Sequence, residues 1–170
     1  VVVFYDCEFT DLTSNSELLS IGFVVSDLAA ELYIEIADAN LETASEFVRK
    51  EVLPLFGKFN PEILTRSNAA KRIAGWLDEL RQGERCRQIV VVSDSTWDWE
   101  HLDRLFGQVS GQSSWSFRLN VVGRTVGQLV DISREITGFS ELIEKYHGEH
   151  NFRHHALVDA RALKSAYWNR

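Results

Sequence analysis

The chain has 170 residues and a formal net charge of −7, from 18 lysines and arginines against 25 aspartates and glutamates. Its 45% hydrophobic and 25% charged residues match an ordinary globular domain and argue against a disordered, collagen-like or coiled-coil chain. Two cysteines, Cys7 and Cys86, favour a reducing cytoplasm over a disulfide framework, and no apolar run approaches the roughly 20 residues of a membrane span.

The beginning of the chain predicts three strands. Each is a run rich in β-branched and aromatic residues: 1–8, 17–26 and 31–36. The first run is apolar on both faces up to Asp6, which is typical of a strand buried inside a sheet. The short link at 27–30 favours a hairpin between the second and third strands.

The remainder predicts alternating helices and strands. Helices are expected at residues 44–56, 68–82, 97–106, 140–147 and 156–168. The helix at 68–82 has the clearest pattern, because its apolar residues recur at i, i+3, i+4 and i+7 from Ile73. Strands are expected at 88–93 and 117–122, with a surface loop at 107–116. Without repeats or linkers, this order predicts one α/β domain over residues 1–170, a mixed β-sheet flanked by helices.

The first predicted strand ends on two carboxylates. Asp6 and Glu8 are two residues apart, so in a strand they project from one face while Cys7 projects from the other. Neighbouring anions repel each other and are costly to desolvate, so the pair needs a cation, a shared proton or full solvation. On its own, this pair is consistent with a solvated strand end as well as with a cation site.

Two further acidic segments follow. Asp94 comes directly after the predicted strand at 88–93, at the type of strand end where α/β proteins bind ligands, and it is an N-cap candidate. Asp98 would then lie one turn into the next helix. Near the end of the chain, His154 precedes a predicted helix and Asp159 lies in its first turn, which brings an imidazole and a carboxylate together.

In this order, the three segments resemble the DEDDh branch of the ribonuclease-H-like 3′–5′ exonucleases. The branch includes oligoribonuclease, ribonuclease T and the proofreading subunit of bacterial DNA polymerase III, and the small adenylate-preferring exoribonucleases are similar in length. Its D-x-E motif matches Asp6-Cys7-Glu8, and its most specific motif, H-x-A-x-x-D-A, matches the segment from His154 to Ala160.

The second motif of that branch is N-x-x-F-D, with a leucine four residues later. Here it is matched by the segment from Asp94 to Asp98, followed by Leu102. The chain departs from the motif at Asp94, where many relatives carry asparagine, and at Trp97, where phenylalanine is usual. The first departure adds a negative charge beside the expected site.

The resemblance implies a catalytic set of four metal ligands and a general base. The ligands are Asp6, Glu8, Asp98 and Asp159, and the base is His154. Two Mg²⁺ or Mn²⁺ ions per site are implied, which agrees with a site built from carboxylates rather than from cysteine and histidine clusters. His155 is the alternative base, because the tyrosine branch of the superfamily carries its titratable residue four positions before the last aspartate.

Substrate contacts are also implied. Phe9 and Thr10 follow the first motif, in a stretch that contacts the terminal nucleotide in the family, and Phe9 either stacks on a base or packs under a loop. Arg153 and Arg161 flank the last motif, either to hold a phosphate or as ordinary exposed arginines. The other histidines are interpreted as bystanders, on a helix surface or in solvated loops: His101, His147 and His150.

These features predict a metal-dependent 3′–5′ exoribonuclease that releases nucleoside 5′-monophosphates from single-stranded RNA by a two-metal-ion mechanism. By resemblance it is expected to be a homodimer. A DNA exonuclease of repair or proofreading type and a catalytically silent binding module are the alternatives. Two bound divalent ions would move the formal charge from −7 to about −3. The substrate is therefore expected to be held at its 3′ end through metal and stacking, without a broad basic track.

Overall fold

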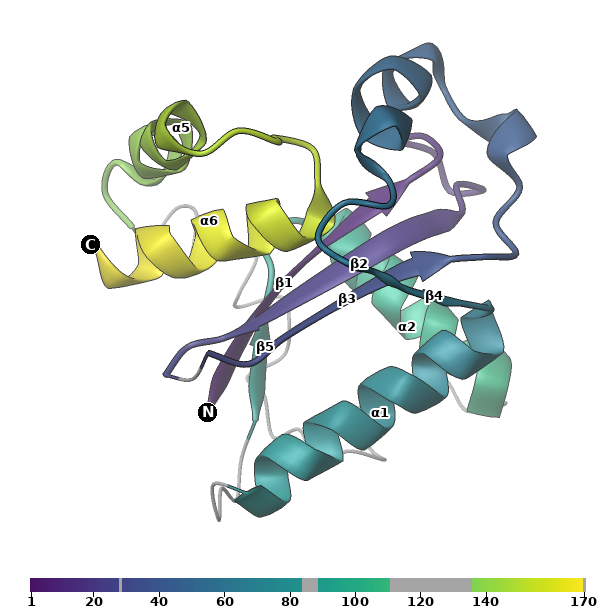
Figure 1. Cartoon of the computed structure of the whole chain (residues 1–170), viewed down its shortest axis with the longest axis horizontal. Coiled ribbons are helices and arrows are strands. Elements are labelled where there is room, and N and C mark those ends of the chain that lie inside the picture. The colour runs from purple at the N-terminus through teal and green to yellow at the C-terminus, as the bar shows by residue number, and fades with distance from the viewer. Residues whose placement is uncertain (28, 84–88, 111–135, 170) are drawn as a thin grey trace.

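The computed structural model describes residues 1–27, 29–83, 89–110 and 136–169. Within these residues a mixed five-stranded sheet is flanked by helices (Figure 1), as the sequence predicted. The strands are β1 (Val2–Phe9), β2 (Leu18–Val25), β3 (Glu31–Ile36), β4 (Glu62–Leu64) and β5 (Val90–Val92). The helices are α1 (Arg66–Gly83), α2 (Thr96–Ser110), α5 (Phe139–Glu149) and α6 (Ala156–Trp168).

The strand order is β4-β3-β2-β1-β5. Strand β2 is antiparallel to both β1 and β3, which confirms the predicted hairpin, whereas β5 runs parallel to β1 and β4 runs parallel to β3. Strand β5 pairs only with Val2–Phe4 of β1. Among the described residues, the part of β1 beyond Phe4 therefore has no strand partner on that edge.

Three local predictions differ from the structure. Instead of one helix at 44–56, a π-helical turn at Val48–Val52 leads into a 3₁₀ turn at Leu53–Leu55, where proline at position 54 has no N–H for a regular helical hydrogen bond. Helix α2 extends to Ser110, into the segment expected to be a loop. Strand β4 was not predicted, because three residues are too few for a recognisable alternation. The strand predicted at 117–122 lies outside the described residues.

The two faces of the sheet are covered by different helices. Val3, Tyr5 and Cys7 of β1 pack in a core with the buried residues of α1 and α2. The intervening residue Phe4 packs in a second core with α5 and α6 on the opposite face. Because side chains alternate along a strand, Asp6 and Glu8 belong to the face of Phe4 and project toward α6.

Gly22 of β2 permits a very close approach of α6 to the sheet. A Cβ atom at this position would lie 2.4 Å from both the backbone nitrogen and the Cα of Leu157, in the first turn of α6. Gly22 is the register partner of Asp6 in the β1–β2 pair. The missing side chain therefore lets the start of α6, with Asp159, lie against the sheet beside Asp6.

None of the helices in the described ranges combines the length and apolar character of a membrane span.

Substituting Gly22→Ala is expected to lower the free energy of unfolding by about 3 kcal/mol, because the added methyl group meets backbone that cannot move away without displacing α6. The measurement is chemical denaturation monitored by circular dichroism. Gly75→Ala is the matched control: this exposed glycine of α1 has open space around it, and alanine there should stabilise the helix by about 0.5–1 kcal/mol. Equal stabilities of Gly22→Ala and the parent chain would contradict this account of the α6 contact.

Candidate metal centre

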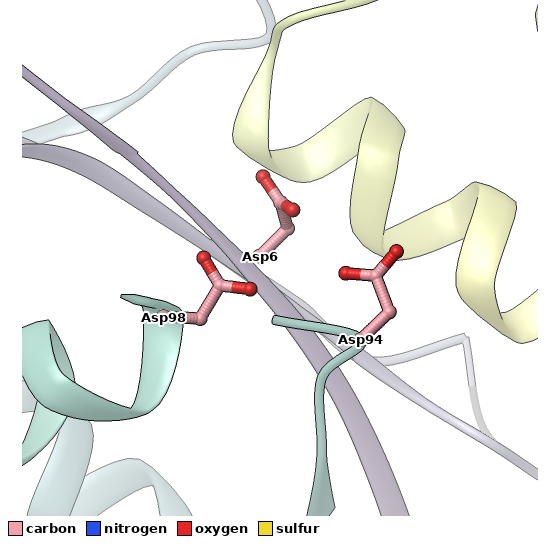
Figure 2. Close-up of side chains that lie close together, drawn as sticks. All are labelled: Asp6, Asp94 and Asp98. Carbon is pink, nitrogen blue, oxygen red and sulfur yellow. The ribbon is translucent and has the colours of Figure 1, made fainter. Parts of the chain in front are cut away.

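The acidic residues meet at the edge of β1 just past the end of β5. Strand β5 pairs with β1 up to Phe4, and Asp94 follows β5 by two residues, so it emerges beside Asp6. Asp98 lies in the first turn of α2 and Asp159 in the first turn of α6. Figure 2 shows three of the side chains converging from β1, the segment after β5 and α2: Asp6, Asp94 and Asp98.

The carboxylates form two groups that share one member. One oxygen atom from each of Asp6, Asp94 and Asp98 lies within 4.8 Å of the other two, and the same holds for Asp6, Glu8 and Asp159. The structure thus brings together the four ligands expected from the sequence. It adds Asp94, which accompanies Asp98 rather than replacing it. These five residues are called the carboxylate cluster below.

The backbone of β1 positions Asp98. The Cys7 amide N–H donates to Asp98 Oδ1 at 3.2 Å, which is possible because β5 does not extend along this part of β1. The Asp98 side chain is only 2% exposed, while its Oδ2 atom has no hydrogen-bond partner in the described structure. A buried carboxylate oxygen without a donor is costly unless a proton or a cation satisfies it.

Burial and mutual repulsion raise the pKa of the clustered carboxyls. For Asp6, desolvation is the main cause of the raised pKa, followed by repulsion from Asp98 and Asp159. Burial likewise raises the pKa of Glu8, Asp94 and Asp98. It raises the pKa of Asp159 to about 7, against a lowering effect of backbone hydrogen bonds. The site therefore favours protons, or cations in their place, over free anions.

A cavity of about 170 Å³ opens beside the cluster, between α5 and α6. Its polar lining residues are Asp6, Asp94, His147, Arg153, His154 and Asp159. We call it the acidic cavity.

His154 and His155 have different surroundings. His154 lines the acidic cavity in a left-handed backbone conformation (φ 64°), its ring lies edge-on to Phe47, and burial lowers its pKa. His155 is 2% exposed and packs against Tyr33 and Phe59, with its pKa lowered to about 4 mainly by burial. The left-handed turn at His154 thus separates the two imidazoles, and of the two only His154 lines the acidic cavity.

Two histidine interpretations from the sequence are wrong. His147 is not solvated: its side chain is 8% exposed, and its Nε2 atom lies 3.2 Å from Asp159 Oδ1. It could have been found from the sequence, because it continues the four-residue spacing of Phe139 and Ile143 on the inner face of α5. His101 is not on the helix surface but 3% exposed, with Nε2 3.0 Å from the Ser16 hydroxyl.

His150, by contrast, is exposed and stacks on Tyr146, with ring centroids 4.1 Å apart. This agrees with the interpretation of His150 as a solvated residue.

Of the four residues expected to contact substrate, two are engaged in other contacts and two lie next to the site. Thr10 has no exposed surface for a substrate, since it is 1% exposed and its hydroxyl accepts the Glu17 amide N–H; the expectation for its side chain is therefore wrong. Arg161 forms a two-point ion pair with Glu31 of β3, which explains its place on α6 without a phosphate.

Phe9 and Arg153 remain next to the site. Phe9 stacks on His101 with ring centroids 4.6 Å apart, and it also lines a second cavity of about 270 Å³ beside Glu8. Its ring therefore has a packing partner as well as cavity surface. Arg153 lines the acidic cavity while pairing with Glu144 of α5.

Comparison with known proteins adds no assignment: no protein-family model matches the chain, and no curated protein sequence matches it.

The raised carboxyl pKa values predict an unusual pH dependence for the metal-free protein. The folded chain retains protons that the unfolded chain releases, so stability falls as the pH rises from about 4 through the folded-state values, about 7 for Asp159. His101 and His155, with pKa values of about 4, oppose this trend below about pH 6.5. Without metal, the free energy of unfolding should therefore fall as the pH rises from about 6.5 through the pKa of Asp159, about 7.

Asp98→Asn tests the cause of this trend. It keeps the oxygen that accepts the Cys7 amide and removes one charge, so it should stabilise the metal-free protein at pH 8 by about 1–3 kcal/mol and flatten the slope. Asp78→Asn, at an exposed i,i+3 pair with Arg81 on α1, is the control and should change stability by less than about 0.5 kcal/mol. Urea titrations in the presence of a chelator, at several pH values, give both the stability at pH 8 and the slope of stability against pH. If Asp98→Asn instead destabilises the protein at pH 8, repulsion among the clustered carboxylates is not the main cause of the stability loss.

Proposed function

We propose that the protein is a metal-dependent 3′–5′ exoribonuclease of the ribonuclease-H-like type. The observation that carries the proposal is the arrangement of two carboxylate groups sharing Asp6, with His154 on the same cavity. The reaction class comes from the resemblance of the three sequence motifs. The geometry supports it because residues from all three motifs face one site.

The donor set fits two hard divalent cations. Carboxylate oxygens are the ligands that Mg²⁺ and Mn²⁺ prefer, and the unpartnered Oδ2 atom of Asp98 is suited to a cation. Asp6, Asp94 and Asp98 would hold one ion, and Asp6, Glu8 and Asp159 the other. Such ions supply Lewis-acid chemistry and positive charge at the scissile phosphate. Asp94 supplies a fifth carboxylate where asparagine would leave the site less negative.

His154 is suited to accept a proton. Burial lowers its pKa, so the imidazole is neutral near pH 7 and one ring nitrogen has a free lone pair. The edge contact with Phe47 and the left-handed backbone fix the ring at the rim of the acidic cavity. His154 would take the proton from the attacking water as the phosphodiester bond is hydrolysed.

The cavity beside Glu8 suits the terminal nucleobase. Apolar side chains dominate its lining, including Phe9, Leu12 and Phe47. Leu12 and Phe47 are 66% and 53% exposed, which leaves surface on which a base can pack. The cavity therefore supports recognition of a single-stranded 3′ end. The preference for RNA rests on the resemblance of the three motifs to those of the exoribonucleases in the DEDDh branch.

The proposal predicts shortening of RNA from the 3′ end. A 5′-labelled RNA oligonucleotide with Mg²⁺ or Mn²⁺ should give a ladder of shorter products, and Asp6→Asn should slow it by about 10³-fold or more, because Asp6 belongs to both carboxylate groups. Asp78→Asn on α1 is the control. Faster digestion of a DNA oligonucleotide of the same sequence would favour the DNA exonuclease. Binding of RNA without cleavage would favour the silent module.

The two neighbouring histidines can be separated with one type of substitution. At saturating metal, His154→Phe should lower the cleavage rate by about 10²–10⁴-fold, through loss of the proton acceptor. His155→Phe should keep most of the activity, because phenylalanine preserves the packing against Tyr33 and Phe59. Circular dichroism checks that both variants fold. A larger rate loss in a folded His155→Phe protein would reverse the assignment.

A further inference from the structure

Helix α5 delivers His147 to the carboxylate cluster. Phe139 and Ile143 of α5 pack in one apolar core with Leu163 of α6, so the helix position is set by that packing. His147 lies four residues beyond Ile143, on the same face of the helix. The face that holds α5 against α6 therefore also places this imidazole over Asp159.

His147 and Asp159 lie close together, and each has one buried polar atom without a hydrogen-bond partner in the described part of the chain. His147 Nε2 lies 3.2 Å from Asp159 Oδ1, and the two side chains are 8% and 18% exposed. The pair does not reach hydrogen-bond geometry: Asp159 Oδ1 and His147 Nδ1 are buried atoms with no hydrogen-bond partner in the described part of the chain. At this distance, a small rotation of the ring would direct a Nε2–H donor at the oxygen.

Besides the backbone amides that already donate to Asp159, the neighbouring side chains are not equivalent donors for its carboxylate. The Arg153 guanidinium makes two hydrogen-bond-length contacts with Glu144, and the His154 ring contacts Phe47. Among the described residues, the ion-pair contact of Asp159 Oδ1 is with the Nε2 atom of His147. His147 also lines the acidic cavity together with Asp159, so a change in the orientation of Asp159 would alter the ligand geometry of the cluster.

We propose that His147 is a positioning residue for Asp159. Its Nε2–H donates to Oδ1 and fixes the direction in which the carboxylate faces the cluster. This inference rests on the proposed function, because it treats Asp159 as a metal ligand. Ligand carboxylates are commonly held by a hydrogen-bond donor of this kind, and loss of the donor typically weakens metal binding by about 10–100-fold.

The experiment measures Mn²⁺ affinity of the full chain by electron paramagnetic resonance. His147→Leu and His147→Phe remove the donor and keep apolar packing on α6, so each should bind Mn²⁺ about 10–100-fold more weakly. His147→Gln restores an N–H donor and should recover most of the affinity. His150→Gln, on an exposed histidine that caps the same helix, is the control and should bind like the parent chain. Melting temperatures of the metal-free proteins are measured in parallel.

The outcomes separate this inference from the proposed function. If a folded His147→Leu or His147→Phe variant binds Mn²⁺ as tightly as the parent chain, the positioning role is wrong. It is also wrong if His147→Gln binds Mn²⁺ as weakly as the Leu and Phe variants. Weak binding by the Leu and Phe variants with recovery in the Gln variant would support it, even if the parent chain cleaves no RNA. In that case only the proposed function fails. A parent chain that binds no Mn²⁺ overturns both.

Discussion

The close contact between Gly22 and the first turn of α6 determines where the acidic side chains meet. A side chain at this position would collide with the backbone of α6, so only glycine lets the helix begin directly against β2. Gly22 is paired with Asp6, and Asp159 lies in the helical turn that makes the contact. One missing methyl group therefore sets the distance between carboxylates that are far apart in the sequence.

The carboxylate cluster is held together against its own repulsion. Apolar cores on both faces of the sheet fix β1, α2 and α6, and these elements impose the positions of the acids. The raised pKa values of the carboxyls show that burial and mutual repulsion make their ionised forms unfavourable when no cation is bound. Because a metal-free cluster opposes folding, bound divalent cations would offset that cost. This is the physical basis of the proposed nuclease.

The histidines near the cluster illustrate how the backbone assigns chemical roles. His154 and His155 are adjacent in sequence, yet a left-handed conformation at His154 directs one ring to the acidic cavity and leaves the other in an aromatic core. His147 reaches the same cavity from a different helix. The proposed proton acceptor and the proposed positioning residue thus line one cavity from two different segments of the chain.

The sequence by itself determined features that depend on local periodicity. Alternation along a strand placed Asp6 and Glu8 on one face, and helical spacing identified the buried face of α1 and the start of α6. The motifs also indicated which acids belong together. Only the tertiary structure decided that Asp94 joins Asp98, that Thr10 is buried and that His147 faces Asp159. These features depend on contacts between distant segments, whose approach is set by packing and by the space at Gly22, and no local pattern encodes them.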